Sequence, residues 1–331
     1  MKKIALYKFN EKKLDLLISK GFKQFDMDKK LKKMKLVMIK PNLVTDIKEY
    51  IDNGANTDIR IIESLLKYLS KFNLRVVIAE SETGTKIKGR KLHKALSLMG
   101  VIKLREKYNF DIVNLTYDKQ IPVNFNGKTL KTVSMGKTSL DADLIINVPK
   151  LKTHKYSTIT CALKNMFGTI PDPLRVIYHR NIHQTIFDLN SIYLDRTFVV
   201  LDGITAMEGK GPLFGEKVDM NLIGFSNDMV VNDIMGAKLM GFDPHEVKHL
   251  NYYIRNEINI EEVGDLKVND IARKFEPCKK NLFVKVEEQL MRNPHLVRFL
   301  LSDFVRKNIS YNLRKVIKKF RGGSYNWYIK K

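Results

Sequence analysis

The sequence predicts an α/β protein with a mainly parallel central sheet and flanking helices. Short runs rich in Val, Ile and Leu recur along the chain, and helical patterns lie between many of them. Continuous apolar runs of this length are typical of strands that are buried on both faces of a parallel sheet. With 331 residues, 44% of them hydrophobic, the chain is long enough to bury a sizeable core.

Five segments have the composition of buried strands. Each is a short run of aliphatic and β-branched residues that ends at a polar residue or a turn. The predicted strands are residues 36–41, 74–80, 143–148, 198–203 and 221–226.

Two helices are predicted from a capping residue at one end as well as from the spacing of their apolar side chains. In residues 57–72, Thr57 is a suitable N-cap and apolar side chains recur at helical spacing. Residues 230–241 end on Gly241, and glycine is favoured just beyond a helix C-terminus.

Residues 117–135 predict a β-hairpin excursion from the sheet. Short alternating runs flank Asn126 and Gly127, a dipeptide that favours the tight turn of a hairpin.

The composition of the chain changes near residue 250. We expect an α/β domain over residues 1–250 and a basic, mostly helical extension over residues 251–331 that packs on the domain or on a membrane surface. In residues 295–331, apolar side chains recur at roughly helical spacing among Arg and Lys, and Trp327 and Tyr328 follow them. A basic amphipathic helix with terminal aromatic residues suits an anionic lipid surface.

The net charge of +23 comes from the two ends of the chain. Residues 1–35 carry 12 Lys or Arg against 4 Asp or Glu, and residues 273–331 carry 16 against 4. Such ends favour solubility or contact with an anionic membrane. A nucleic-acid partner is not expected, because neither RNA-binding aromatic motifs nor a helix-turn-helix are found.

The sequence predicts a cytoplasmic location, with peripheral attachment at the inner membrane face as an alternative. No apolar run approaches the length of a membrane span, and charge interrupts the N-terminus before a signal-peptide core can form. Cys161 and Cys278 are the two cysteines of the chain. An iron–sulfur cluster held by this chain alone is therefore not expected.

Polar residues lie at or just beyond the ends of all five predicted strands. In an open parallel sheet, ligands bind beyond the carboxyl ends of the strands, so these residues predict a site there. They are Lys40, Glu80 with Ser81, Lys150 with Lys152 and His154, Asp202, and Asn227 with Asp228.

The stretch PKLKTH contributes the densest positive charge. If it is extended, its period of two places Lys150, Lys152 and His154 on one side. We expect the next helix to begin within residues 156–158, and its free N–H groups would favour an anion. Lysines supply charge and His154 supplies proton transfer near neutral pH, so a carboxylate or phosphate is expected there. The alternative is a solvated loop that balances acidic neighbours.

The acidic half of the expected site lies in residues 200–216. Asp202 and Glu208 bracket a loop in which Gly209 and Gly211 can present backbone N–H groups to an anion. The glycine spacing is neither the dinucleotide fingerprint nor a Walker A loop. With Asp233 on the following helix, the acids suit proton transfer, hydroxyl binding or a Mg²⁺ ion, and the sequence leaves these three roles open.

His179 and His183 have the spacing of four that places two imidazoles on one helix face. The pair lacks the glutamate of an HExxH zinc motif. We expect His179 to contribute to the site and His183 to lie on a helix surface.

Six motifs together resemble the DUF362 family, over roughly residues 1–250. The resemblance implies that the motifs form one functional site in a family of uncharacterised proteins, some of whose members carry ferredoxin-like cysteine clusters. This chain lacks those cysteines, so an electron-transfer role would need a separate redox partner. The motifs are IKPNLV (39–44), DADLIINVPKLKTH (141–154), CALKNMFGTIP (161–171), YH (178–179), VLDGITAMEGKGPLFGE (200–216) and NDMVVNDIMGAKLMG (227–241).

The leading hypothesis is an enzyme that acts on a small anionic metabolite, with His154 paired to Asp202 or Glu208 for proton transfer. The alternatives are an accessory protein that docks an iron–sulfur partner, and a protein that binds membranes or nucleic acid through its basic ends. The expected binding residues are Lys40, Asn42, Glu80, Lys150, Lys152, Lys164, Asn165, His179, Gly209, Gly211 and Asp233.

Overall fold

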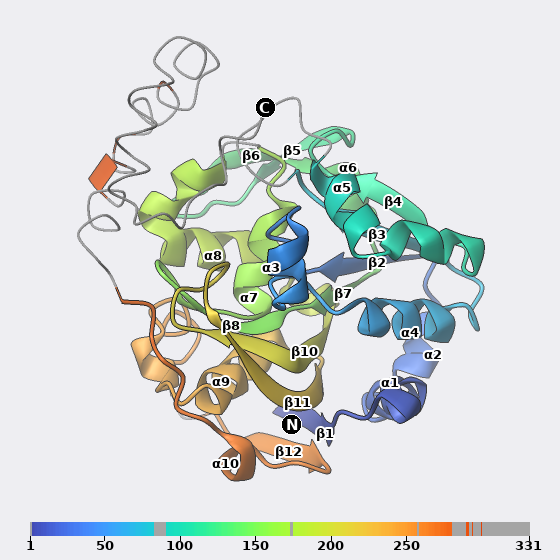
Figure 1. Cartoon of the computed structure of the whole chain (residues 1–331). Helices are drawn as coiled ribbons and strands as arrows, with labels where there is room; N and C mark the ends of the chain where they lie inside the picture. Colours follow the sequence, from blue (N-terminus) through green and yellow to red (C-terminus); the bar gives the residue numbers. More distant parts are fainter. Residues whose placement is uncertain are drawn as a thin grey trace.

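The centre of the fold is a mixed, mostly parallel sheet (Figure 1). The structure is a computed structural model that describes residues 2–82, 91–172, 175–256 and 258–279, with positions 289, 290, 293 and 299. The sheet comprises β1 (Lys2–Lys8), β2 (Leu36–Pro41), β3 (Arg75–Glu80), β4 (Asp111–Asn114), β7 (Leu144–Val148), β8 (Lys150–His154), β9 (Thr158–Thr160), β10 (Thr197–Glu208), β11 (Glu216–Ser226) and β12 (Ile260–Gly264).

The strand order is β12-β1-β11-β10-β7-β2-β3-β4, and β8 leaves this path to pair with β10 and β9. Five strands run parallel, each paired with the next in the order β10, β7, β2, β3 and β4. The antiparallel pairs are β1 with β11, β10 with β11, and β8 with β9. The predicted α/β class is therefore confirmed, and all five predicted strands are present. Sequence analysis did not assign β1, β4 or β12.

The predicted hairpin is confirmed as a separate antiparallel pair. It joins β5 (Gln120–Asn124) to β6 (Thr132–Gly136). Asn126 adopts the left-handed conformation, with φ of 48°. This is the conformation for which Asn and Gly are favoured in tight turns.

Helices cover both faces of the sheet, and the alternation of side chains along the strands divides the core in two. Met38 of β2 packs in one apolar cluster, while its neighbours Val37 and Ile39 pack in the other. The second cluster includes residues of α1 (Leu14–Lys23), α2 (Met27–Leu31), α4 (Ile59–Leu69) and α5 (Lys91–Leu98). The first includes residues of α7 (Ala162–Asn165), α8 (Ile182–Asn190), α9 (Met229–Leu239) and α10 (Val268–Ile271). The short helices α3 (Lys48–Asp52) and α6 (Lys137–Asp141) lie in connections.

The two predicted helices are present, but one N-cap differs from the prediction. Asp58, not Thr57, caps α4, because its carboxylate accepts a hydrogen bond from the Arg60 N–H at 2.9 Å. The Thr57 hydroxyl instead donates to the Val148 carbonyl at 2.8 Å and accepts from the Asn42 N–H at 2.8 Å. It therefore ties the end of β2 to the end of β7. Gly241 follows α9 with φ of 74°, as expected for a C-terminal glycine.

Part of the described chain after position 250 belongs to the sheet and its core. β12 pairs in parallel with β1, and Phe275 is buried in the core. The expected division of the chain near residue 250 stays a prediction. The basic segment 295–331 lies outside the described residues except at Phe299.

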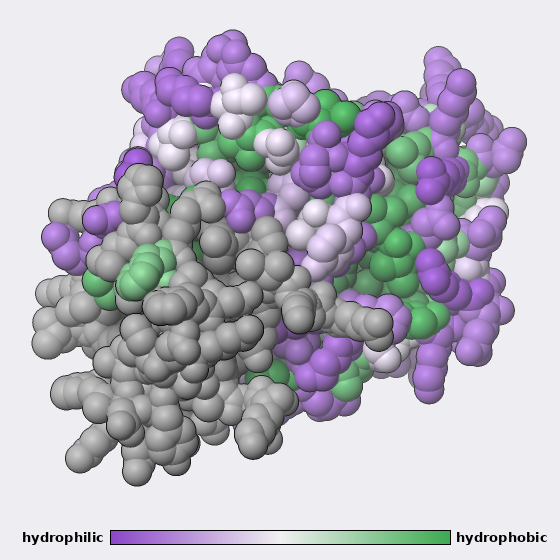
Figure 2. Space-filling view, turned by 90° about the horizontal axis from the view of Figure 1, so that it is seen from above, coloured by the Kyte–Doolittle hydropathy of each residue, from purple (hydrophilic) through white to green (hydrophobic). Residues whose placement is uncertain are grey.

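The described surface mixes polar and apolar side chains in the view from above (Figure 2). Among the described residues, no helix combines the length and the apolar character that crossing a membrane requires.

Gly21 sets how closely α1 packs on β11. A Cβ atom at this position would lie 2.4 Å from the ring of Phe225, which is fully buried. We expect Gly21→Ala to lower the free energy of unfolding by about 1–3 kcal/mol, since a buried ring must shift. Urea denaturation measures this, with the exposed Lys20→Ala on the same helix as the control. Stability of Gly21→Ala equal to wild type would contradict the packing described here.

Candidate active site

A cavity lies at the topological switch point of the sheet. Along the chain, β2 leads to β3 and β4 on one side, whereas β7, on the other side of β2, leads to β10. Ligands of open α/β sheets bind beyond the carboxyl ends of the strands at such a point. The cavity has a volume of about 180 Å³. Of the predicted site residues, those that line it are Asn42, Glu80, His154, Lys164, Asn165 and His179.

Lys40 and Glu80, at the ends of β2 and β3, form a buried ion pair beside this cavity. Lys40 Nζ also donates to the Pro41 carbonyl at 2.9 Å, and Glu80 Oε1 accepts from the Ser81 N–H at 3.0 Å. Burial raises the pKa of Glu80 and lowers that of Lys40, and each partner opposes the shift of the other. Gly168 permits this arrangement, because a Cβ there would lie 2.2 Å from Glu80 Oε1.

A chain of side-chain amides links Lys152 of β8 to the ends of β2 and β7. Lys152 Nζ donates to Asn42 Oδ1 at 2.7 Å, and Asn42 Nδ2 donates to Asn165 Oδ1 at 3.1 Å. Asn165 Nδ2 donates in turn to Asn147 Oδ1 at 2.7 Å and to the Lys40 carbonyl at 3.3 Å. These bonds fix the orientation of the amides that face the cavity.

Lys152 is fully buried, and within the described part of the chain its amino group donates to neutral oxygens alone. Besides Asn42, its acceptors are the carbonyls of Ala55 at 2.9 Å and Pro212 at 3.4 Å. Burial lowers the pKa of Lys152 well below its ordinary value, and the nearby Lys150 and Lys164 lower it further. Because Asn42 and Pro212 line the cavity, Lys152 lies directly behind its wall.

Lys150 and Asp202 form a second buried ion pair, which does not line the cavity. Lys150 Nζ lies 2.9 Å from Asp202 Oδ2, and the side chains are 1% and 0% exposed. Asp202 also accepts from the Asp58 N–H at 2.8 Å, at the start of α4, and from the Ile204 N–H at 3.2 Å. The pair therefore ties β8, β10 and α4 together.

His154 faces the cavity with one ring nitrogen already engaged. Its Nδ1 accepts from the backbone N–H groups of Tyr156 at 3.0 Å and Ser157 at 3.3 Å. Burial and the charge of Lys164 lower the pKa of His154 well below its ordinary value. The neutral imidazole therefore carries its proton on Nε2 and is a hydrogen-bond donor there. The ring of His179 stacks 6.3 Å away and also lines the cavity.

The spacing of His179 and His183 does not bring them together. His179 lies in the 3-10 helix η4 (Arg175–Asn181), while His183 lies in α8 and stacks on His249 at 5.8 Å. Within the described part of the chain, no cluster of three or more His, Cys, Asp or Glu side chains is placed to hold a metal ion.

Lys164 and Arg175 supply the cationic lining of the cavity. Lys164 Nζ lies 4.2 Å from the centre of the Phe167 ring. Burial lowers the pKa of Lys164 to about 7, and the charges of Arg175 and Lys40 add to this effect. Arg175 Nη1 donates to the carbonyls of Glu82 at 2.7 Å and Ile170 at 3.5 Å. Among the residues the structure describes, neither cation has a carboxylate within ion-pair distance.

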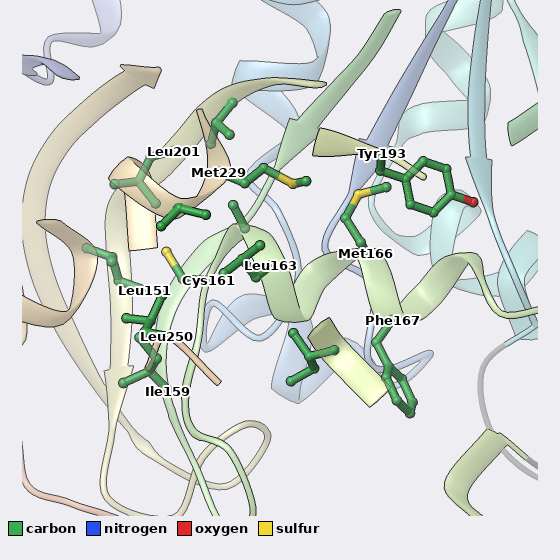
Figure 3. Packing of buried hydrophobic residues seen from close by; sticks show 14 of the residues in the cluster. Leu151, Ile159, Cys161, Leu163, Met166, Phe167, Tyr193, Leu201, Met229 and Leu250 are labelled. Carbon is green, nitrogen blue, oxygen red and sulfur yellow. The ribbon is translucent and has the colours of Figure 1, made fainter. Parts of the chain in front are cut away.

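The expected helix start at residues 156–158 is wrong. A turn and β9 intervene, and α7 begins at Ala162. Asp233 occupies the N–H groups of that helix, accepting from Ala162 at 2.7 Å and from Leu163 at 3.0 Å. Burial raises the pKa of Asp233 to about 6. Asn232 Nδ2 donates both to Asp233 Oδ1 at 3.1 Å and to Cys161 Sγ at 3.2 Å, which places Asp233 in the core near Cys161, one of the packed side chains labelled in Figure 3.

Glu208 and the glycine loop lie behind β8. Glu208 Oε2 accepts from the Glu276 N–H at 2.9 Å, and the Gly209 carbonyl accepts from the Thr153 hydroxyl at 3.1 Å. A Cβ on Gly211 would lie 2.0 Å from the Thr153 carbonyl oxygen. The loop thus packs tightly on β8 and brings Pro212, rather than its glycines, into the lining.

Sequence analysis missed several lining residues, of which Arg175 matters most for charge. It follows the second proline of PDPLRVIYH and precedes the histidine that was predicted. A basic residue four positions before a candidate site histidine was the available signal. The other missed lining residues are Leu43, Val44, Thr160, Phe167, Gly168 and Pro212.

The fold and the cavity define an α/β protein with a cationic, amide-lined site at a sheet switch point. The chain belongs to the DUF362 family, a domain of unknown function, whose family model matches residues 37–238. The resemblance inferred from the motifs is thereby confirmed.

Among characterised sequences, the chain is 30% identical over 116 residues to Thylakoid-associated protein sll1697 of Synechocystis sp.. This alignment covers 33% of the chain and 36% of that protein. Among solved structures, it is similar to the lactate racemase apoprotein of Thermoanaerobacterium thermosaccharolyticum, with a TM-score of 0.43 and 11% identity over 72% of this chain and 57% of that one. A protein of Thermotoga maritima gives a TM-score of 0.40 and 12% identity over 76% and 61%. Likeness at this level assigns no activity to the chain.

The buried pair of Lys150 and Asp202 predicts a strong stability effect. Lys150→Met should lower the free energy of unfolding by about 3–5 kcal/mol, because it leaves a buried carboxylate without its charged partner. The double variant Lys150→Met with Asp202→Asn should recover part of this loss, because it removes the unpaired charge and keeps an amide oxygen as an acceptor for a backbone N–H group. The exposed pair Lys217–Asp219, at 3.3 Å, supplies the control, and Lys217→Met should change stability by less than about 1 kcal/mol. Urea unfolding curves in which both lysine variants behave alike would contradict the structural role of the pair.

Proposed function

We propose that this protein is an enzyme that binds a small carboxylate or phosphate metabolite in the switch-point cavity and moves a proton on it. The observation that carries the proposal is that Lys164 and Arg175 line one cavity, and that neither is ion-paired within the described residues. Both side chains are partly buried, and a partly desolvated cation without a carboxylate partner is costly, so the cavity favours an anion that supplies the negative charge.

The charge balance of the lining supports an anionic ligand. Glu80 is the carboxylate of the lining, and Lys40 already offsets its charge. His154 and His179 are neutral near pH 7, because burial lowers the pKa of both well below the ordinary value. Lys164 and Arg175 therefore leave the cavity net positive.

The volume and the polar groups limit the ligand to a small molecule. A cavity of about 180 Å³ is smaller than the roughly 300–1,000 Å³ of pockets for drug-sized ligands. His154 Nε2–H and the second amide N–H of Asn42 add hydrogen-bond donors beside the cations, and Asn165 holds the Asn42 amide in place. Such a set can bind and orient one acidic head group.

Within this proposal, Glu80 is the proton-transferring carboxyl. It lines the cavity together with His154, and its raised pKa makes it a stronger base than an ordinary carboxylate. The sequence-based partners of His154, Asp202 and Glu208, have their hydrogen bonds elsewhere. We therefore assign Asp202 and Lys150 a structural role and not a role in proton transfer.

The pKa of about 7 at Lys164 predicts a pH-dependent affinity. The groups that act on it are Arg175, Lys40 and Glu80, with His154 and His179 across the cavity. As the pH rises through 7, Lys164 loses its proton and the attraction to an anion weakens. Binding near pH 7 should take up a proton.

Calorimetry with sulfate and propionate checks this, because neither ligand titrates in the range used. Affinity should fall by about 10- to 30-fold between about pH 6 and about pH 8.5, close to the limit that loss of one proton with this pKa allows and within the range of one charged hydrogen bond. Lys164→Arg should remove most of this fall, since a guanidinium stays charged. Lys164→Met should bind weakly at both values. Absence of binding by any small anion in wild-type protein would sink the proposal.

A further inference from the structure

The lysines around the cavity differ in what their amino groups contact. Lys40 and Lys150 each have a carboxylate, and Lys152 has three neutral oxygen acceptors. Lys164 lines the cavity directly and rests over the face of Phe167. In the described structure it has neither a hydrogen bond nor an ion pair. It is therefore the amine that a ligand in the cavity can reach.

The environment of Lys164 also holds much of it as the free base. With a pKa of about 7, roughly half of the amine is neutral at pH 7, against on the order of one part in a thousand for an ordinary lysine. A neutral amine carries a lone pair and is a nucleophile toward carbonyl carbon.

Two residues that line the cavity with Lys164 can bind the carboxylate and the carbonyl oxygen of a keto acid. Arg175 uses Nη1 on carbonyl oxygens, and the other N–H donors of its guanidinium suit a carboxylate. His154 carries a proton on Nε2, which can donate to a carbonyl oxygen. An amine, a carboxylate-binding group and an oxygen-binding group thus line one small cavity.

We propose that the substrate is a small 2-oxo acid and that Lys164 forms an imine with its carbonyl carbon. This inference rests on the proposed function, because it places the substrate carboxylate at the same cations. It goes further by naming the substrate class and a covalent step.

The step needs no other reactant. The Lys164 ammonium first releases one proton to solvent. The lone pair of the neutral Nζ then attacks the carbonyl carbon, and the nitrogen passes one of its own protons to the carbonyl oxygen to give a carbinolamine. The carbinolamine hydroxyl then takes a second proton and leaves as water while the C=N bond forms. In sum, a lysine ammonium and a ketone give an iminium ion and water.

The imine also defines a chemical role for Glu80, that of a base. An iminium ion withdraws electrons from the neighbouring carbon, which makes a proton on that carbon more acidic. Glu80 is the carboxyl group of the lining and can accept that proton, while Lys40 stabilises its charged form. The covalent step and the proton transfer are thereby joined in one site.

Reductive trapping tests the inference on the intact chain. Pyruvate, glyoxylate and 2-oxoglutarate are each added at pH 7 with sodium borohydride, and the labelled lysine is found by intact mass and peptide mapping. We expect one reduced adduct per chain, at Lys164, from at least one of the three acids. Lys164→Arg should lose the adduct, whereas Lys238→Arg, at an exposed position of α9, should retain it. Propionate, which lacks the carbonyl, should slow the labelling by competition.

The outcomes separate this inference from the proposed function. Binding of propionate with no adduct at Lys164 from any of the three acids overturns the imine and leaves anion binding in place. Label spread over exposed lysines, or unchanged in Lys164→Arg, also overturns it. Failure of every small anion to bind removes both. Mapping of the wild-type adduct keeps the test decisive even if the arginine variant does not fold.

Discussion

The burial of lysine ammonium groups is the constraint on which the rest of this structure depends. A charged amine removed from water needs a compensating partner, and the chain meets that need in three ways. Lys40 and Lys150 have buried carboxylates, and Lys152 has three neutral oxygens. Lys164 faces the cavity instead. The first three sites stabilise the walls of the cavity, while the fourth leaves positive charge available to a ligand.

The sheet topology explains why these groups lie together. Strands β2 and β7 are neighbours from which the chain proceeds in opposite directions, so a crevice opens beyond their carboxyl ends. The strand β8 leaves the main path there and pairs with β10 and β9. Its Leu151 belongs to the same apolar cluster as Ile159, and both are labelled in Figure 3. The lysines on either side of Leu151 are therefore directed away from that core. A short strand thus supplies both core packing and the polar back wall of the site.

Some of this could be predicted from the sequence because it follows from local pattern. The apolar runs predicted five of the strands, and Asn126 with Gly127 predicted the hairpin. The period of two placed Lys150, Lys152 and His154 on one side on the condition that PKLKTH is extended, as it is in β8. The existence of a polar site beyond the strand ends followed from the parallel sheet alone. In each case, a few adjacent residues decide the structure.

What could not be predicted depends on pairings between distant segments. Nothing local distinguishes Lys150, which bonds Asp202, from Lys164, which faces the cavity, because the difference lies in strand order. The capping of α7 by Asp233 joins residues 71 positions apart, so that acid was expected in the site instead of the core. Arg175 was missed because its place in the lining depends on where η4 packs.

Crystallography with selenate, an anion that can be located by its anomalous signal, tests the central claim most directly. The account predicts a selenate in the switch-point cavity, in contact with Lys164 and Arg175, and its loss from that place in Lys164→Met. Selenate bound only at exposed lysines of the N-terminal helices, with the cavity free of it, would contradict the account.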